Sequence, residues 1–381
     1  MILNANWNYP TSILFGKGRI SEIADACKTL AITKPLFVTD KALAKTDIAK
    51  KTRAYLKNAG ISDDMFSDVD PNPTDKNVDA GLKIYRAGGY DGVIAFGGGS
   101  ALDLAKVIAF MAGQTLPLWD FEDVDDWWKR ANINGIHPIV AIPTTAGTGA
   151  EVGRASVICN TQTDEKKIIF HPKILPSMVI CDPELTVGMP KAITAGTGLD
   201  AFAHCVEAYS SPHYHPMSQG IALEGMRLVK EYLPRAYCDG SDIEARAHMM
   251  SAATMGATAF QKGLGAIHAL SHPIGAIYHT HHGTTNALCM PPVLQFNKSA
   301  IKERFDRASA YLGIKGGFEG FCAYVDDLNA SMSIPKTLSE LGIKNPDIDR
   351  LVKDALKDPS VGGNPVEMTQ ENTRALLLSF A

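Results

Sequence analysis

The chain lacks the features of membrane-spanning, secreted and nucleic-acid-binding proteins. No uninterrupted apolar run is long enough to span a bilayer. The N-terminus, Met-Ile-Leu-Asn-Ala-Asn-Trp-Asn, has neither a basic region nor an apolar core, so we expect no secretory signal peptide. No run rich in Lys and Arg occurs, and the formal net charge of −4 at pH 7 argues against a nucleic-acid partner. We therefore expect a cytoplasmic protein that binds neither membranes nor nucleic acids.

Cysteines are few and scattered. The 7 cysteines are odd in number, and no two of them form a Cys-x-x-Cys pair. This argues against a disulfide framework and a zinc knuckle, and it is typical of reduced thiols in the cytosol. With 381 residues, 45% of them hydrophobic and 20% charged, the chain is long enough to bury more than one core. We expect two domains.

The first half of the chain alternates short apolar runs with helical patterns. Strands are expected at residues 35–40, 92–96 and 138–142, and helices at 45–58, 76–86 and 101–111. Strands that alternate with helices predict an α/β fold around a mostly parallel, Rossmann-like sheet. Residues 155–182, rich in β-branched side chains, are expected to finish or flank that sheet. The acidic, aromatic stretch at 119–128 is expected to be a solvated surface loop with some packing.

The second half has helical patterns and no convincing strand. Helices are expected at residues 191–209, 216–233, 242–261, 263–277, 299–312, 316–329 and 347–356. The Met-Pro-Lys segment at 189–191 marks the change, because Pro is favoured where a helix begins. We therefore expect an α/β domain over residues 1–187 and an all-α domain over residues 188–381.

Potential metal ligands lie in two groups within the second half. Asp200 and His204 are four residues apart, so on a helix their side chains share one face. His268 and His272 repeat that spacing. Three further histidines follow closely, and the His-Gly pair at 282–283 is expected to present an imidazole from a turn. The five histidines of the second group, out of 11 in the chain, are His268, His272, His279, His281 and His282.

One carboxylate with several neutral imidazoles suits Fe(II) or Zn(II) and leaves a coordination position open for a substrate. Each of these residue patterns also has a structural explanation that involves no metal. A single histidine on an apolar helix face is more often a core residue than a ligand, and an Asp/His pair at this spacing is often a surface hydrogen bond. The clustering of histidines favours the metal site over these alternatives.

A glycine-rich loop, Gly97–Ser100, follows the strand at 92–96 and precedes a helix. Glycines allow backbone amides to approach an anion, and a helix N-terminus attracts it, so a pyrophosphate fits here. Three glycines can also make a simple tight turn.

Asp40, after an earlier strand, is suited to bind an adenosine ribose and repel a 2′-phosphate, which favours NAD over NADP. Its alternative is an ordinary strand-end acid. A second loop, 143–151, offers threonine hydroxyls and amides to the same cofactor.

Taken together, these motifs resemble the iron-containing (group III) alcohol dehydrogenases. The resemblance extends over nearly the whole chain, through the segments at 10–18, 38–40, 71–74, 97–106, 143–152, 182–186 and both histidine groups. It implies a dehydroquinate synthase-like architecture in which NAD(H) and one divalent metal meet between the dinucleotide-binding and metal-binding domains. It further implies interconversion of a short-chain alcohol and its aldehyde by a homodimer or larger homo-oligomer.

The resemblance also implies roles for individual residues. It makes Asp200, His204, His268 and His282 the metal ligands, with Fe(II) preferred and Zn(II) as the alternative. His282 is chosen because the ligand of the family directly precedes the Gly of a His-Gly-x-x-Asn-Ala stretch. His272 would lie beside the reacting carbon and relay a proton. The implied cofactor contacts are Asp40, Asn72, Gly98, Gly99, Ser100, Thr144, Thr145, Thr148, Lys166 and Leu185.

Two cations suggest the substrate. The stretch Gln261–Gly265 resembles family members that act on 4-hydroxybutyrate, and Arg154 with Lys262 is expected to hold the carboxylate of such an ω-hydroxy acid. The alternative is that both are surface or ion-pair cations. Competing functions are a glycerol or diol dehydrogenase, a dehydroquinate synthase, a maleylacetate reductase and a non-catalytic NAD- or metal-binding module. The full set of four ligands argues against the glycerol dehydrogenase, the synthase and the reductase.

Overall fold

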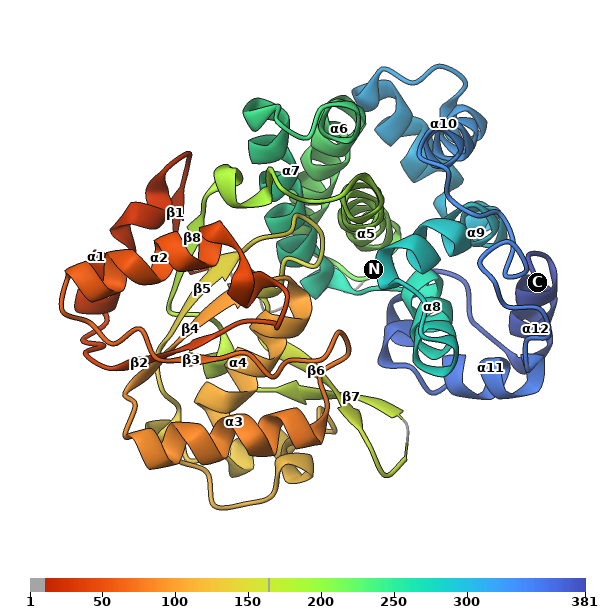
Figure 1. Cartoon of the computed structure of the whole chain (residues 1–381). Helices are drawn as coiled ribbons and strands as arrows, with labels where there is room; N and C mark the ends of the chain where they lie inside the picture. Colours follow the sequence, from red (N-terminus) through yellow and green to blue (C-terminus); the bar gives the residue numbers. More distant parts are fainter. Residues whose placement is uncertain (1–10, 164) are drawn as a thin grey trace. The chain divides into compact units, whose positions relative to one another are not determined.

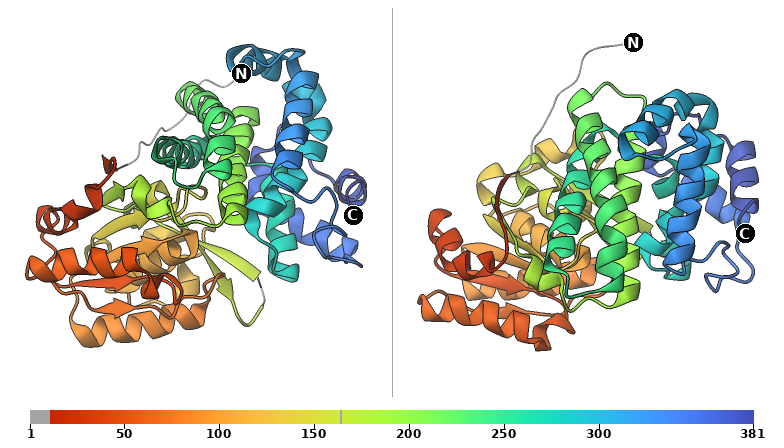
Figure 2. Two further views of the ribbon diagram at one scale, coloured as in Figure 1. Left: turned by 45° about the horizontal axis from the view of Figure 1, so that its top comes forward. Right: turned by 90° about the horizontal axis from the view of Figure 1, so that it is seen from above.

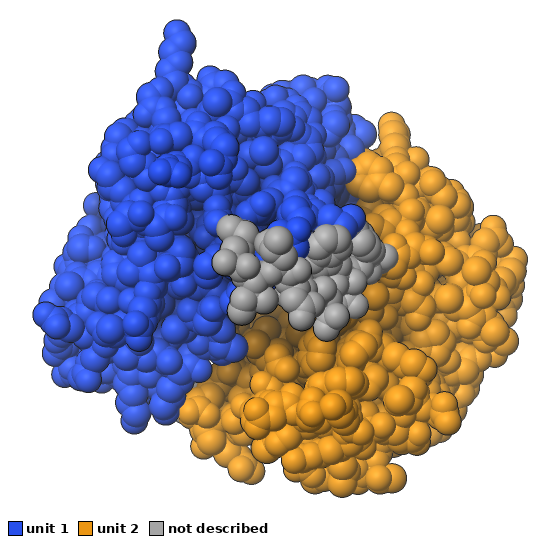
Figure 3. Space-filling view, turned by 180° about the vertical axis from the view of Figure 1, so that it is seen from behind, with its two compact units in different colours: residues 1–8, 189–381 blue, residues 9–188 orange. Residues whose placement is uncertain are grey.

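The computed structural model describes residues 11–163 and 165–381 (Figure 1). These residues divide into two compact units, one that ends at Gly188 and one that runs from Met189 to Ala381 (Figure 3). In the part of the chain that is described, no helix is long and apolar enough to cross a membrane.

The first unit is built on a parallel sheet of six strands in the order β1-β8-β5-β4-β2-β3. Its strands are β1 (Ser12–Phe15), β2 (Pro35–Val38), β3 (Met65–Phe66), β4 (Gly92–Gly97), β5 (Ile139–Pro143) and β8 (Met178–Cys181). Its helices are α1 (Ile23–Thr29), α2 (Asp47–Asn58), α3 (Asp75–Gly88) and α4 (Gly99–Met111). The pair α1 and α2 covers one face, and α3 and α4 cover the other (Figure 1). The predicted α/β class is confirmed.

Burial explains why the central strands are continuous apolar runs. Every residue of β2, β4 and β5 is buried, as expected for parallel strands with helices on both faces. Helix α4 is buried along nearly its whole length as well. Helix starts are set by side-chain caps: Thr46 caps α2, and Thr74 forms a capping box with Asn77 at the start of α3.

The segment at 155–182 divides between two sheets. Strand β8 completes the parallel sheet, whereas β6 (Ala155–Asn160) and β7 (Glu165–Phe170) pair antiparallel in a separate two-stranded sheet. The stretch at 119–128 was predicted to be a solvated surface loop with some packing, and Phe121 is the residue that packs. Phe121 is fully buried and meets the ring of Phe110 edge-on at 5.0 Å, because one apolar side chain anchors this otherwise acidic turn.

The second unit contains only helices among its described residues, which agrees with the expected all-α class. They are α5 (Lys191–Ser210), α6 (Pro216–Cys238), α7 (Ile243–Ala259), α8 (Ala266–Tyr278), α9 (His282–Leu312), α10 (Gly317–Ser331), α11 (Ile348–Ala355) and α12 (Gln370–Leu378), with short 3-10 turns between some of them. Helix α5 is central: all its residues from Thr194 onward are buried, and it packs against α6, α7 and α9 (Figure 2).

Two features of this unit differ from the prediction. Helix α9 begins at His282, whereas the sequence predicted a helix only from residue 299. Pro291 and Pro292 lie inside α9, and proline is usually a helix breaker. His282 is therefore the first residue of a helix and not part of a turn. Helix α12 was not predicted at all.

Candidate metal centre and dinucleotide-binding loops

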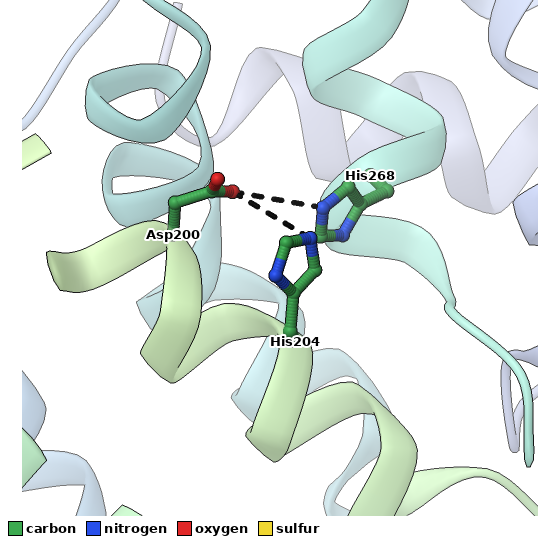
Figure 4. A group of neighbouring side chains, drawn as sticks. All are labelled: Asp200, His204 and His268. Atoms are coloured by element: carbon green, nitrogen blue, oxygen red, sulfur yellow. Dashed lines mark ion pairs between the residues drawn. The ribbon is translucent and has the colours of Figure 1, made fainter. Parts of the chain in front are cut away.

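Asp200 and His204 share one face of the buried helix α5, as their spacing predicts. The Asp200 Oδ1 atom lies 3.8 Å from His204 Nε2 and 3.9 Å from Nε2 of His268, which projects from α8 (Figure 4). All three residues are buried, and one ligand atom from each lies within 4.8 Å of the others. A carboxylate and two imidazoles from two helices therefore converge on one point.

His282 joins this group from the start of α9. Its Nε2 atom lies 3.5 Å from Asp200 Oδ1, and its side chain is 33% exposed. The next residue makes this approach possible, because a Cβ on Gly283 would lie 2.0 Å from the carbonyl oxygen of Gly196 in α5. Glycine at 283 thus lets α9 begin directly against the helix that carries Asp200 and His204.

The other two histidines of this segment, His279 and His281, have structural roles at helix ends. His281 precedes α9 and caps it, since its Nδ1 accepts the backbone amide of Thr284 at 3.3 Å. His279 is exposed and adopts the left-handed conformation that ends α8, with φ 55°. Of the three neighbours that the sequence left open, His282 is the one whose imidazole lies beside Asp200.

Asn286, one turn after His282, directs its side-chain amide at the same donor atoms. Its Nδ2 lies 2.8 Å from Asp200 Oδ1, 3.2 Å from His268 Nε2 and 3.1 Å from His282 Nε2. The amide hydrogens bring partial positive charge to the lone pairs that a metal would use. The buried Oδ1 of Asn286 has no hydrogen-bond partner among the described residues, which is rare for such an atom. The carboxylate and imidazoles are donors that a divalent cation binds, and in this structure the Asn286 amide occupies their lone pairs.

The ionisation state of Asp200 also favours a bound cation. Burial favours the neutral form of Asp200, but the imidazoles of His204, His282 and His268 and the Asn286 amide outweigh it, so the pKa of Asp200 is lowered. Asp200 is therefore ionised at neutral pH. An ionised buried carboxylate among imidazoles attracts a cation.

Two acidic residues support histidines of the group. Burial alone would lower the pKa of His268, but the carboxylates of Glu207 and Asp200 raise it above the usual value. Glu207 accepts a hydrogen bond from His268 Nδ1 at 2.5 Å. Asp358 makes the equivalent contact, 2.7 Å, with His272 Nδ1, and the ring of His272 stacks on that of His282 at 5.3 Å.

The sequence prediction missed Glu207, Asn286 and Asp358, and two of them had a detectable signal. Glu207 follows Asp200 and His204 at the spacing of a single helix face, and Asn286 follows His282 by one turn. Asp358 lies 86 residues beyond His272 and carries no local signal.

In the α/β unit, the two predicted cofactor loops lie side by side. A Cβ on Gly98 would lie 3.3 Å from Thr145 Cγ2, and one on Gly99 would lie 2.8 Å from Thr148 Cγ2. The Thr144 amide donates to the Gly97 carbonyl at 2.9 Å. The glycine loop leads into the N-terminus of α4, so the amides of both loops are available near a helix dipole.

The remaining predicted cofactor residues are distributed around these loops. Asp40 follows β2 and accepts the amides of Ala42 and Leu43, and its other oxygen lies 3.9 Å from where a Cβ on Gly97 would be. Ser100 Oγ donates to the Pro71 carbonyl, which brings the segment that contains Asn72 to the glycine loop.

The last two, Lys166 and Leu185, lie on other elements of the α/β unit. Lys166 lies in β7 and pairs with Cys159, which in turn forms a bridge with Thr74. Burial lowers the pKa of this lysine. The side chain of Leu185 belongs to the hydrophobic core, in the turn after β8.

The two predicted substrate cations have different surroundings. The Lys262 ammonium is fully buried in the helical unit, where it donates to the carbonyls of Ala208 at 2.9 Å and Ser211 at 2.7 Å. Burial and nearby Arg304 lower its pKa to about 7. This argues against the predicted carboxylate-binding role, because the ammonium is already occupied by the C-terminal carbonyls of α5. Arg154, in the α/β unit, is half-buried over the ring of Phe170 at 5.6 Å and forms no ion pair with any described residue.

Comparison with known proteins places the chain among metal-dependent oxidoreductases that use a nicotinamide dinucleotide. Residues 10–183 match the family described as iron-containing alcohol dehydrogenase, and residues 194–380 match the C-terminal part of the Fe-containing alcohol dehydrogenase family. The chain is 37% identical over 379 residues to 4-hydroxybutyrate dehydrogenase of Cupriavidus necator. The aligned region covers 97% of this chain and 98% of that protein.

Solved structures give the same result. A crystal structure of a 1,3-propanediol oxidoreductase superimposes with a TM-score of 0.94 at 35% identity, covering 99% of this chain and 100% of that one. Sulfoacetaldehyde reductase from Bifidobacterium kashiwanohense, in complex with NAD+, gives a TM-score of 0.90 at 30% identity and 99% coverage of both chains. The chain belongs to the iron-containing alcohol dehydrogenase family, and the resemblance of its motifs is confirmed. It is a metal- and NAD-dependent alcohol dehydrogenase that acts on small molecules.

Proposed function

We propose that this enzyme interconverts a short ω-hydroxy acid, such as 4-hydroxybutyrate, and the corresponding semialdehyde, with NAD(H) and one Fe(II). The observation that carries the proposal is the convergence of Asp200, His204, His268 and His282 from three helices. One carboxylate and three imidazoles leave a coordination position for a substrate oxygen. The set suits Fe(II), and Zn(II) is the alternative that metal analysis distinguishes.

Each unit then has one task. Residues 1–187 form the dinucleotide-binding domain, in which Gly98, Gly99, Ser100, Thr144, Thr145 and Thr148 bind the pyrophosphate, and Asn72, Lys166 and Leu185 contact other parts of the cofactor. Asp40 binds the ribose hydroxyls and disfavours a 2′-phosphate. Residues 188–381 form the metal-binding domain.

The chemistry is divided between the bound groups and the chain. When bound, the cation supplies a Lewis acid that lowers the pKa of a substrate hydroxyl, and NAD supplies the hydride acceptor. His272 moves the proton: Asp358 engages its Nδ1 at 2.7 Å, so its Nε2 is the atom that accepts or returns a proton. Hydride transfer requires no nucleophile, so the cysteines need have no role in it. The described thiols of Cys27, Cys205 and Cys289 are buried, and burial raises the pKa of each.

Two observations support a carboxylate-bearing substrate. The relative from Cupriavidus necator, at 37% identity over nearly the whole of both chains, is named for 4-hydroxybutyrate. Arg154 offers a guanidinium without an ion-pair partner among the described residues. A diol dehydrogenase is the second candidate, and it rests on the TM-score of 0.94 with a 1,3-propanediol oxidoreductase.

The proposal also includes a homo-oligomeric, cytoplasmic enzyme. The scattered cysteines support a reducing compartment, since no described pair forms a disulfide. The proposed homo-oligomer rests on the family resemblance, and light scattering of the purified protein during size-exclusion chromatography measures the oligomeric state directly.

The test is a metal analysis of anaerobically purified protein, combined with an NADH-oxidation screen of succinate semialdehyde, butanal and 3-hydroxypropanal. We expect about one iron per chain, because a single donor set is proposed, and the highest kcat/KM for succinate semialdehyde. A preference for 3-hydroxypropanal would favour the diol dehydrogenase. Bound metal and NAD without turnover of any aldehyde would contradict the proposal and favour a non-catalytic binding module.

A further inference from the structure

Glu207 is a buried carboxylate whose surroundings are unusual. Its side chain is 4% exposed, and among the described residues it forms no ion pair with Lys or Arg. Its Oε2 atom accepts from His268 Nδ1 at 2.5 Å, and its Oε1 atom accepts the backbone amide of Ile267 at 2.6 Å. A buried charge is costly unless hydrogen bonds or opposite charges compensate it, and here the start of α8 provides the compensation.

The contact with His268 determines which ring nitrogen carries the hydrogen. A carboxylate only accepts, so His268 Nδ1 must donate, and in the neutral ring Nε2 is left with its lone pair. The Nε2 atom that carries this lone pair lies 3.9 Å from Asp200 Oδ1, so the lone pair belongs to the group of proposed metal ligands. Glu207 therefore fixes both the rotation of the ring and the tautomer that a metal requires.

We propose that Glu207 is the positioning residue for the metal ligand His268, and that it sets the metal affinity of the site. The proposal rests on the proposed function, because it assumes that His268 binds the cation. Glu207 also brings a second negative charge, so that Asp200 and Glu207 together balance the two positive charges of a divalent ion. It touches neither substrate nor cofactor in this role.

Capping of α8 is the alternative explanation for Glu207, and the structure supplies a matched control for it. The first amides of α8 have two side-chain acceptors. Glu207 Oε1 accepts the amides of Ile267 at 2.6 Å and His268 at 3.4 Å, and Asn364 Oδ1 accepts that of Ala266 at 3.1 Å. Asn364 is also buried, but it makes no hydrogen bond with His268. Removing Asn364 therefore weakens the start of the helix and leaves the imidazole contact intact.

The experiment measures Co(II) affinity by chelator competition on metal-free protein, with the Co(II) absorption spectrum and Tm recorded in parallel. The variants are Glu207→Gln, which removes the charge, Glu207→Asp, which keeps it, and Asn364→Ala. We expect Glu207→Gln to weaken Co(II) binding about 10- to 100-fold, as loss of such partners does. Glu207→Asp should recover part of that loss, and Asn364→Ala should change affinity less than about threefold while lowering Tm.

The outcomes separate this inference from the proposed function. Equal losses of Co(II) affinity in Glu207→Gln and Asn364→Ala would reduce Glu207 to a helix cap and overturn the proposal. Unchanged affinity in Glu207→Gln would overturn it too. If Glu207→Gln does not fold, the comparison of Glu207→Asp with Asn364→Ala decides, because only the aspartate variant should alter the Co(II) spectrum. If the parent protein binds no metal, the proposed function itself fails.

Discussion

The α/β unit and the helical unit build their candidate sites from different parts of the chain. In the α/β unit, the groups offered to a ligand are mainly backbone amides, on two short loops that follow strands β4 and β5. In the helical unit, they are side chains on three helices, and α5, α8 and α9 must pack correctly before the donor atoms meet. A backbone site is encoded locally by glycines, whereas a side-chain site depends on tertiary packing.

The largest effect is expected from removing a ligand in the helical unit. His268→Ala or His282→Ala should reduce metal affinity more than about a hundredfold, beyond what loss of an outer hydrogen-bond partner costs, and should abolish turnover. Binding of NAD should be almost unchanged, because its loops belong to the other unit. Metal content by mass spectrometry and NAD binding by fluorescence titration measure the two effects.

His248→Ala is the control for these variants. His248 lies in the same unit but stacks on Tyr232 at 3.9 Å, outside the donor set. Full metal content and activity in His282→Ala would disprove the assignment of His282 and would make His281 the next candidate.

The second prediction compares one glycine from each unit. Gly283→Ala should destabilise the protein by about 1–3 kcal/mol and lower its metal content, because the new Cβ would lie 2.0 Å from the rigid carbonyl of Gly196. Gly99→Ala should cost less, since its Cβ meets the Thr148 side chain at 2.8 Å, and that side chain can shift. Thermal unfolding followed by circular dichroism measures both. Equal Tm values for the two variants would contradict the importance of the Gly283–Gly196 approach.

This contrast also explains how much of the molecule could be predicted from the sequence. The spacing of Asp200 and His204 predicted their shared helix face, and the run of glycines after β4 predicted the loop at the start of α4. Both are local features, fixed by a few neighbouring residues. The alternation of strands and helices likewise predicted the parallel sheet.

Features that depend on tertiary packing could not be predicted in this way. His282 was expected in a turn because Gly283 follows it, whereas the packing of Gly283 against α5 lets helix α9 begin at His282. Lys262 lies only six residues before His268, yet its side chain runs to the end of α5, a direction that sequence distance does not reveal.

A third, smaller effect is expected in the α/β unit. Asp40→Gly should weaken NAD and improve NADP use, so that the ratio of the two kcat/KM values shifts by about 10- to 100-fold, as expected for loss of hydrogen bonds to a charged group. The carboxylate acts on both cofactors, binding the ribose diol of NAD and repelling the phosphate of NADP. Steady-state kinetics with each cofactor provides the measurement. An unchanged ratio would mean that Asp40 only caps the turn at Ala42 and Leu43.

The last prediction concerns substrate charge and compares one cation from each unit. If Arg154 binds the substrate carboxylate, the parent enzyme should prefer succinate semialdehyde to butanal by about one to two decades in kcat/KM, which corresponds to 1.5–3 kcal/mol for a charge-assisted contact. Arg154→Met should remove that preference and leave kcat/KM for butanal unchanged. Lys262→Met should keep the preference but lower Tm, because it removes a buried donor to the carbonyls of Ala208 and Ser211. Loss of the preference in Lys262→Met at an unchanged Tm would restore the role that the sequence suggested. A parent enzyme that prefers butanal would rule out the hydroxy acid and leave an alcohol dehydrogenase for neutral substrates.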